Sequence, residues 1–373
     1  MKDKNQFFAL FSAVCVATLL HFFPLPLPAQ PLPTASPEAP AIISPTNSHI
    51  QIVGRVDARD PAGVRIAYPG VTVRFRFTGT FAVVELTSDA DDTYVATIVE
   101  GSKPQVHRLA KGTNEIAISA ADLGPGPHTV EVVKRTETWQ GVLTFTGVRL
   151  GTEAALVAPS PLPQRKLLFI GDSVTCGAGV DNWPVCPAET NRHSNAYEAY
   201  GMVLGRRLDA QAELVCYGGR GVVRDYLGHR SMQAPQFFNF SVPADDKAQR
   251  ARWTDDGWTP DAVVISLGTN DWNLQKSDPV SAEEFVTNYL GLVRDVRKHY
   301  PKAWILLTQG SIVSDPKLNE YVQATVKRAN DPRVLWFASR HFAGSTCDAH
   351  PDKPQHQQIA DDFEVKLREI LGW

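Results

Sequence analysis

The chain has 373 residues, of which 43% are hydrophobic and 21% are charged. This balance is that of an ordinary globular protein, and the length is enough for about two domains with tails. The formal net charge of −3 gives no reason to expect a nucleic acid or an anionic membrane as a partner.

The first 29 residues have the pattern of a secretory signal peptide. Two lysines precede the apolar run from Phe7 to Leu20, and a small residue, Ala29, ends the segment. The run is shorter than the ~20 residues that a membrane-spanning helix needs, so we expect residues 1–29 to be cleaved. The mature protein is then expected to be secreted or periplasmic, free of the membrane and monomeric. Residues 30–46 are rich in proline, which predicts an extended linker.

Residues 47–155 are expected to form a β-sandwich of jelly-roll type. Short runs of alternating apolar and polar residues are separated by turn residues such as Gly79 and Gly112, and no helical pattern interrupts them. Evenly spaced short strands are typical of sandwich domains. The strands are expected at 71–77, 81–86, 94–99, 114–118, 128–133 and 142–148.

A different pattern begins after a proline-containing linker at 153–164. Apolar runs now alternate with amphipathic stretches of helical length. This alternation predicts an α/β domain of three layers, α/β/α, with a parallel sheet over residues 164–373. Ser281, followed three residues later by Glu284, marks a helix start. Strands are expected at 167–170, 212–217, 262–267, 304–308 and 334–337, and helices at 196–208, 282–300, 319–330 and 355–371.

Four polar or glycine-containing blocks lie after strands or before the last helix of this domain. Ser173 follows the first strand within Gly-Asp-Ser, Gly219 follows the second, Asn270 follows the third, and His350 precedes the last helix. Gly-Asp-Ser alone would indicate only a turn. However, the carboxyl ends of parallel strands share one edge of a sheet, so we expect the four residues to converge there.

This set of residues is what ester hydrolysis requires. A serine hydroxyl becomes a nucleophile when a base takes its proton, and histidine suits that role near neutral pH. The backbone N–H groups of Ser173 and Gly219 and the side-chain amide of Asn270 are expected to form the oxyanion hole. Ser173 is thus predicted to be the nucleophile and His350 the general base.

The blocks resemble those of the SGNH (GDSL-type) hydrolases. Gly-Asp-Ser-x-Thr-Cys-Gly at residues 171–177, the preceding sandwich and Lys-Arg-Thr-Glu at 134–137 further resemble carbohydrate esterase family two. The resemblance implies a secreted serine esterase that removes O-acetyl groups from plant-type polysaccharides or oligosaccharides, such as xylan and glucomannan, through an acyl-serine intermediate. It implies neither a metal nor another cofactor.

The orienting acid departs from the SGNH pattern. Many SGNH hydrolases place an aspartate three residues before the histidine, but Cys347 stands there and Asp348 is two residues before His350. Either Asp348 orients the imidazole, or backbone carbonyls do so in a Ser-His dyad, as in members of the esterase family. An acidic residue near a helix start is also favoured by the helix dipole alone. Trp272 is a candidate wall for stacking a sugar, with buried packing as the alternative.

Four cysteines remain once the signal peptide is removed, which in an exported protein favours disulfides. Three pairings are open, and Cys176–Cys186 is our first choice because it closes the shortest loop. No Cys or His spacing typical of a zinc site is present.

Two other functions are open on the sequence. One is a lipase or arylesterase on the same scaffold, although the sequence has no long apolar lid segment. The other is a carbohydrate-binding protein with a vestigial esterase site. Activity on acetylated xylan or mannan, compared with a long-chain acyl ester, distinguishes the first, and glycan binding by the sandwich tests the second.

Overall fold

The computed structural model of the protein describes residues 41–181, 191–346 and 349–373. The expected signal peptide, most of the proline-rich linker, Cys186 and Asp348 lie outside these residues. The two predicted domains belong to one structural unit, Pro40–Trp373. No helix in the described part of the chain has the length and apolarity needed to cross a membrane.

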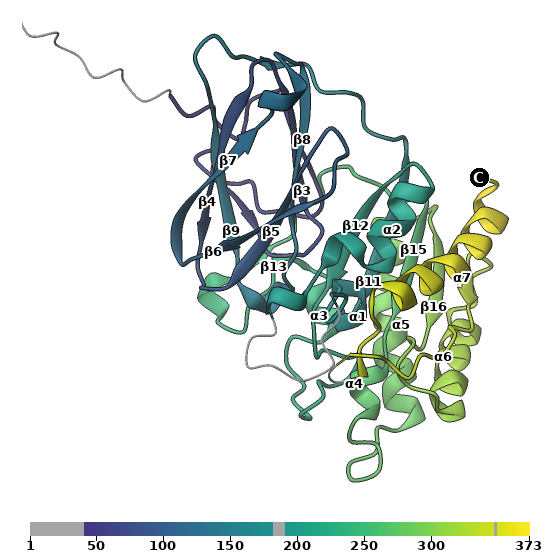
Figure 1. The fold of residues 1–373 in the computed structure, drawn as a ribbon. Helices are drawn as coiled ribbons and strands as arrows, with labels where there is room; N and C mark the ends of the chain where they lie inside the picture. The colour runs from purple at the N-terminus through teal and green to yellow at the C-terminus, as the bar shows by residue number, and fades with distance from the viewer. Residues whose placement is uncertain (1–40, 182–190, 347–348) are drawn as a thin grey trace, which may run out of the picture. The chain divides into compact units, whose positions relative to one another are not determined.

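The N-terminal domain consists of two antiparallel sheets, which confirms the expected sandwich (Figure 1). Val73, Phe75 and Phe77 alternate with half-buried polar residues and point into the core between the sheets. One sheet has the order β1 (Ile50–Val53), β3 (Thr72–Phe77), β8 (His128–Lys134), β5 (Thr93–Val99) and β6 (Gln105–Leu109), with β10 (Leu156–Val157) also paired to β3. The other has the order β2 (Val64–Ile66), β9 (Leu143–Leu150), β4 (Phe81–Ser88) and β7 (Gly112–Ser119).

All six strands expected in the sandwich are present, but four others were not predicted from the sequence. β1, β2 and β10 are only two to four residues long, too short for a periodic pattern. β6 has the sequence Gln-Val-His-Arg-Leu and lies at a sheet edge, largely exposed. Because it buries one face so little, it has no clear alternation of apolar and polar residues.

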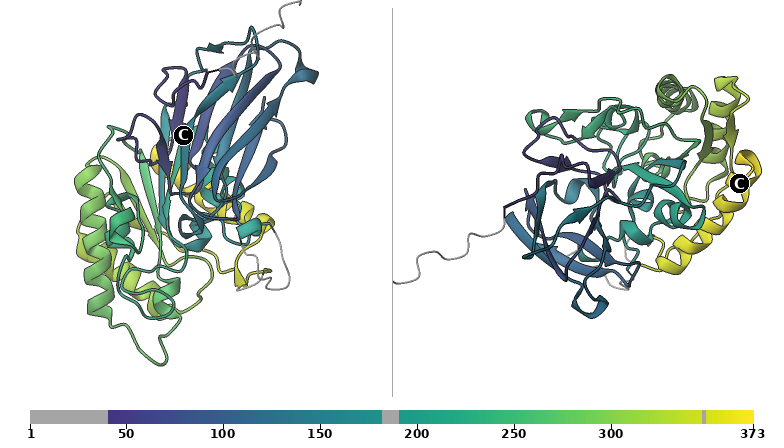
Figure 2. Two further views of the ribbon diagram at one scale, coloured as in Figure 1. Left: turned by 90° about the vertical axis from the view of Figure 1, so that its left-hand side faces the viewer. Right: turned by 90° about the horizontal axis from the view of Figure 1, so that it is seen from above.

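The C-terminal domain is built on a five-stranded parallel sheet between helices, which confirms the α/β fold (Figures 1 and 2). In one inner strand of the sheet, Leu167 and Phe169 pack into the core on one face, whereas Leu168 and Ile170 pack into the core on the other face. Successive side chains of a strand point to opposite faces of the sheet. The strand order is β12 (Ala210–Cys216), β11 (Arg165–Gly171), β15 (Ala262–Ser266), β16 (Trp304–Thr308) and β17 (Val334–Trp336). The longer helices are α2 (Tyr200–Arg207), α5 (Ala282–His299), α6 (Pro316–Ala329) and α7 (Lys353–Leu371).

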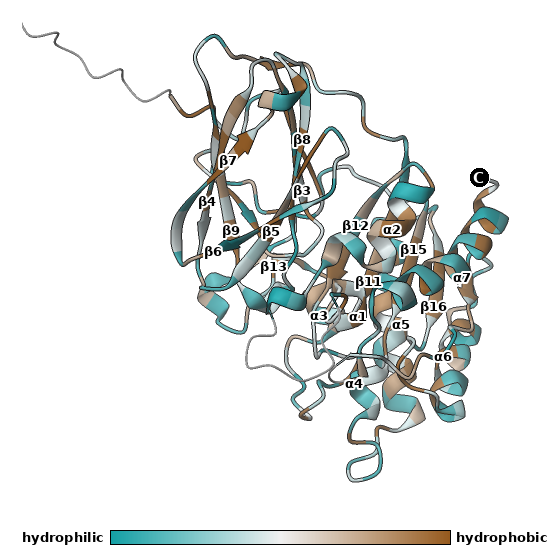
Figure 3. Cartoon of the chain, viewed as in Figure 1, coloured by the Kyte–Doolittle hydropathy of each residue, from teal (hydrophilic) through white to brown (hydrophobic). Residues whose placement is uncertain are grey.

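The helices follow the physical signals at their ends. The Ser281 side chain accepts the Glu284 N–H at the start of α5, as expected. α6 begins three residues earlier than expected, because Asp315 caps it and Pro316 occupies the first helical position. The helices are hydrophilic along their outer sides, whereas the parallel strands are hydrophobic (Figure 3).

The expected helix at 196–208 is wrong in its first turn. Residues Ala196–Glu198 form a separate 3-10 turn, and Ala199 has extended backbone (ψ 148°) before α2 begins. The Ala196 N–H donates to the Arg135 carbonyl at 3.1 Å, so this segment is bonded to the sandwich rather than to a helix of its own.

The sandwich and one face of the parallel sheet share a hydrophobic core. The larger cluster of buried residues includes Phe75 of the sandwich together with Leu168 and Val215 of the parallel sheet. The Tyr68 hydroxyl donates to the Phe237 carbonyl at 3.0 Å and adds a buried polar connection. The sandwich is therefore packed as part of the same body that carries the predicted catalytic blocks.

Candidate active site

The register of the parallel strands brings three predicted blocks together. Gly171, the last residue of β11, is paired with Cys216 of β12 on one side and Ser266 of β15 on the other. Ser173, Gly219 and Asn270 each follow one of these positions by two to four residues. The strand order reverses here, and such a switch point at the carboxyl ends is where open α/β sheets bind ligands.

Ser173 and His350 are in direct contact. Ser173 begins the short helix α1 (Ser173–Cys176), whose first turn is capped by Asp172 accepting the Val174 N–H at 3.1 Å. His350 lies just before α7, and its Nε2 is 2.7 Å from Ser173 Oγ. The Thr346 hydroxyl donates to the His350 carbonyl at 2.8 Å. This geometry allows the imidazole to take the hydroxyl proton directly.

The three expected oxyanion donors line the same cleft. Ser173 is the first residue of a helix, so its N–H has no partner within that helix. Gly219 has φ 77°, a backbone conformation that favours glycine, and an added Cβ would lie 3.0 Å from the Tyr226 ring. Asn270, in α4 (Thr269–Trp272), is buried and donates from Nδ2 to the Arg220 carbonyl at 2.9 Å. A primary amide has a second N–H for a substrate oxygen.

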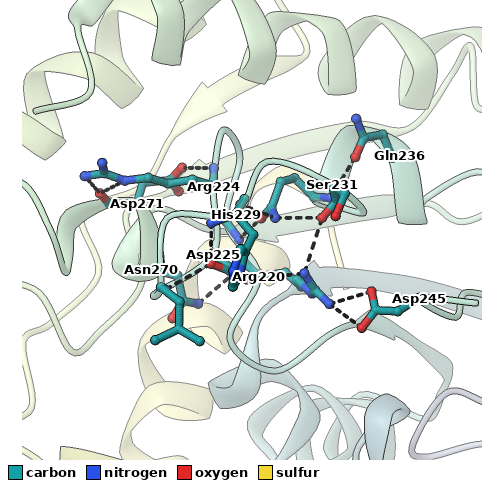
Figure 4. Close-up of polar contacts among 12 residues, drawn as sticks. Arg220, Arg224, Asp225, His229, Ser231, Gln236, Asp245, Asn270 and Asp271 are labelled. Atoms are coloured by element: carbon teal, nitrogen blue, oxygen red, sulfur yellow. Dashed lines mark hydrogen bonds and ion pairs between the residues drawn. The ribbon is translucent and has the colours of Figure 1, made fainter. Parts of the chain in front are cut away.

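Asp271 holds the glycine loop and Asn270 together. Its fully buried carboxylate accepts the backbone N–H groups of Val222, Val223 and Arg224 at 2.9, 2.7 and 3.1 Å. Burial raises the pKa of Asp271 to about 6, and these hydrogen bonds oppose the rise. The Arg224 guanidinium donates to the Asp271 backbone carbonyl oxygen (Figure 4). Hydrogen bonds in both directions therefore join the glycine loop to the segment that carries Asn270.

The loop after Gly219 contains a charged cluster that sequence reasoning did not assign to the site. Arg220 contacts Asp225 at 3.4 Å and Asp245 at 2.8 Å. His229, an exposed side chain, places Nδ1 2.9 Å from Asp225 Oδ2. Figure 4 shows this cluster beside Asn270. These contacts between opposite charges hold the loop in place. No motif in the sequence indicates the cluster.

All four residues predicted to carry the chemistry line one open cleft of about 1210 Å³. Its walls include aromatic and aliphatic side chains, Trp139, Tyr226 and Leu227 among them, each about half exposed. Trp139 and Glu137 come from the sandwich domain. In the sequence, the segment 134–137 indicates only the family resemblance, and no motif places it in the site.

Trp272 lines the cleft with only a small part of its surface. Its side chain is 8% exposed, and Nε1 donates to Asp315 Oδ2 at 2.8 Å. Its ring packs edge-on against Phe285 and Tyr321. The packing role is therefore visible, whereas its role as a sugar-binding wall stays a prediction.

Two acidic residues are candidates for a role at the nucleophile, Asp348 and Asp172. Asp348 lies outside the described residues, so the choice between a triad and a dyad stays a prediction. Asp172 is buried, and burial raises its pKa to about 7. Its carboxylate caps α1 by accepting the Val174 N–H, which is a structural role.

The predicted Cys176–Cys186 disulfide is wrong, because Cys176 is bonded to Cys216. Cys176 ends α1 and Cys216 ends β12, and the pairing of β11 with β12 brings their Cα atoms to 5.6 Å. That separation is ideal for a disulfide. Proximity here is set by strand register, and the shortest loop in sequence is not a guide to it.

Among residues 41–181, 191–346 and 349–373, no group of three or more His, Cys, Asp or Glu side chains could hold a metal ion.

Comparisons with known proteins agree with this architecture. Residues 52–161 match the "Carbohydrate esterase 2 N-terminal" model, and residues 169–359 match the "GDSL-like Lipase/Acylhydrolase family" model. The chain is 33% identical over 336 residues to an "Acetylxylan esterase / glucomannan deacetylase" of Cellvibrio japonicus, covering 89% of this chain and 91% of that protein. The chain belongs to carbohydrate esterase family two.

Solved structures of family two esterases have the same fold. The enzyme from Cellvibrio japonicus superimposes with a TM-score of 0.83 at 31% identity, covering 90% of this chain and 99% of the other. The enzyme from Clostridium thermocellum, solved in complex with cellohexaose, has a TM-score of 0.79 at 29% identity, covering 87% and 99%. This protein, a member of family two, is therefore a carboxylic ester hydrolase that contains both domains of the family.

Proposed function

We propose that the protein is a secreted esterase that removes O-acetyl groups from plant-type polysaccharides or their fragments through an acetyl-Ser173 intermediate. The observation that carries the proposal is the 2.7 Å contact between Ser173 Oγ and His350 Nε2 at the carboxyl ends of the parallel strands. The substrate class is supported by the relative named as an acetylxylan esterase and glucomannan deacetylase, and by the cellohexaose complex of another.

The first half of the reaction transfers the acetyl group to the enzyme. Ser173 Oγ attacks the acetyl carbonyl carbon while its proton moves to His350 Nε2. The carbonyl oxygen becomes an oxyanion that accepts the Ser173 N–H, the Gly219 N–H and an Asn270 amide N–H. The bond to the sugar oxygen then breaks, and His350 returns the proton to that oxygen.

The second half regenerates the enzyme. Water enters the open cleft and loses a proton to His350 as it attacks the acetyl-Ser173 carbonyl carbon. The second oxyanion uses the same three donors. Collapse releases acetic acid, and the proton on His350 returns to Ser173 Oγ.

The test is acetate release by a Ser173→Ala variant. Wild-type protein should release acetate from acetylated xylan or glucomannan, and the variant, which lacks the nucleophile, should not. Circular dichroism of the variant controls for folding. A variant with wild-type rates would contradict the mechanism. A long-chain acyl ester as a parallel substrate distinguishes this function from a lipase, because we expect acetyl esters to be strongly preferred.

Export is part of the proposal. The basic start and apolar run of residues 1–29 support cleavage of a signal peptide. The mature protein recovered from the medium or the periplasm should begin near Gln30 and have the mass of a monomer in solution. A protein that retains Met1 and stays with the cytoplasmic fraction would contradict export.

A further inference from the structure

A turn of the sandwich domain enters the cleft beside the nucleophile. β8 ends at Lys134 and is followed by the 3-10 turn η2 (Thr138–Gln140). Glu137 and Trp139, from this turn, line the cleft together with Ser173. Trp139 is 51% exposed, although tryptophan is one of the largest apolar surfaces a chain can offer. An exposed indole in a cleft is a ready contact for a ligand.

The turn is rigidly built. The Glu137 N–H donates to Gln140 Oε1 at 2.8 Å, and the Glu137 carboxyl accepts the Gln140 N–H in return. Lys134, a buried side chain whose pKa burial lowers to about 7, donates from Nζ to the carbonyls of Thr136 and Glu137 at 2.7 and 3.0 Å. The position of Trp139 is therefore fixed before a ligand arrives, which lowers the entropy lost on binding.

The same turn is bonded to the catalytic domain. The Thr138 hydroxyl donates to the Cys216 carbonyl at 2.6 Å, and Cys216 is bonded through its sulfur to Cys176 of the nucleophile's helix. One chain of contacts thus runs from η2 through the end of β12 to α1, which Ser173 begins.

Gly218 lies against both side chains of the turn. A Cβ added to Gly218 would stand 2.0 Å from Glu137 Oε2 and 3.0 Å from Trp139 Nε1. Only a glycine allows the carboxyl and the indole to approach the backbone this closely, and the next residue is Gly219 of the expected oxyanion hole. The turn therefore forms the cleft wall next to the oxyanion loop.

The Glu137 carboxyl is in an unusual environment. Oε2 is buried and has no hydrogen-bond partner of normal geometry in the described part of the chain. The pKa of Glu137 is raised to about 8, chiefly by burial; Asp172 contributes to the rise, whereas the indole N–H of Trp139 and Lys134 oppose it.

We infer that Trp139 is the surface on which a sugar ring of the acetylated chain packs, and that Glu137 is the positioning residue that holds this indole against Gly218. The inference rests on the proposed esterase function and extends it: the N-terminal domain supplies part of the binding site for the carbohydrate. The indole face contacts the apolar C–H face of a pyranose ring, while the acetyl group reaches Ser173.

The first test separates sugar binding from chemistry. Trp139→Ala should raise KM for an acetylated xylo-oligosaccharide about tenfold, because an aromatic contact of this kind is worth on the order of 1.4 kcal/mol. kcat/KM for 4-nitrophenyl acetate, which has no sugar, should stay within about twofold of wild type. Trp336→Ala, a half-exposed tryptophan of β17 outside the cleft, is the matched control and should change neither value.

The outcomes are distinct. An unchanged KM for the oligosaccharide overturns the inference. An equal loss on both substrates also overturns it, because the indole would then support the catalytic machinery rather than the sugar. A wild-type protein that cleaves the aryl acetate but not the oligosaccharide refutes the proposed substrate class itself and the inference with it.

The second test concerns Glu137. Glu137→Ala should raise KM for the oligosaccharide as Trp139→Ala does, whereas Glu137→Gln, which keeps the side-chain shape and one of the two acceptor oxygens, should raise KM clearly less than Glu137→Ala. The double variant Glu137→Ala with Trp139→Ala should be no worse than Trp139→Ala alone, since both remove one contact. Additive losses, or failure of the glutamine to rescue, would overturn the positioning role.

Discussion

The Cys176–Cys216 disulfide should contribute strongly to stability. It closes a loop of 40 residues, and the chain entropy removed from the unfolded state by such a loop corresponds to about 4 kcal/mol. Both cysteines are completely buried, so the double variant Cys176→Ala, Cys216→Ala also loses packing. We expect the free energy of unfolding of the double variant to fall by about 4 kcal/mol or more.

The assay is urea unfolding of wild type and variant, followed by tryptophan fluorescence. Cys186→Ala serves as the control, because the structure pairs Cys176 with Cys216 and the bond should survive this change. A non-reduced digest of wild type should contain Cys176 and Cys216 in one linked peptide. A loss of less than about 1 kcal/mol in the double variant, or a peptide linking Cys176 to Cys186, would refute the reasoning.

Three further predictions concern the oxyanion segments and the buried acids. Asp271→Asn should lower the free energy of unfolding by on the order of 3 kcal/mol, because one of three buried N–H groups would face an amide donor. The control is Asp245→Asn, a change in the exposed ion-pair partner of Arg220. It should lower the free energy of unfolding by less than about 1 kcal/mol in the same denaturant titration. Asn270→Ala should reduce kcat for acetate release about 10²- to 10³-fold with little change in KM, and an unchanged kcat would remove Asn270 from the oxyanion hole. Burial raises the pKa of Glu213 from 4.5 to about 7, so the folded state keeps a proton that the unfolded state loses, and stability falls as pH rises through this window by at most about 3 kcal/mol. Glu213→Gln should abolish that part of the decline between pH 4.5 and 7, and parallel pH profiles of variant and wild type would contradict the assignment.

The catalytic cleft could be predicted from the sequence because its signals are local. Ser173, Gly219 and Asn270 lie two to four residues after strands of five to seven mostly apolar residues, and parallel strands bring their own carboxyl ends together. His350 could be added because it lies shortly before the predicted terminal helix. In each case the pattern within a few residues determines both the element and the end at which the residue lies.

The remaining features depend on contacts between distant segments. The disulfide follows from the register of β11 with β12, which no spacing of cysteines encodes. Likewise, the place of Trp139 in the cleft depends on how the sandwich packs onto the end of β12 through Thr138. The Lys-Arg-Thr-Glu segment at 134–137 was the available signal, since its buried Lys134 and Glu137 build the turn that carries the indole.

The central claim is that Ser173 carries the acetyl group during turnover. The most direct measurement is mass spectrometry of the enzyme quenched in acid during steady-state hydrolysis of an acetylated oligosaccharide. We predict a fraction of the protein heavier by one acetyl group, with the added mass on the peptide that contains Ser173 and absent in Ser173→Ala. An active wild-type enzyme with an acetyl group on another residue would contradict the account.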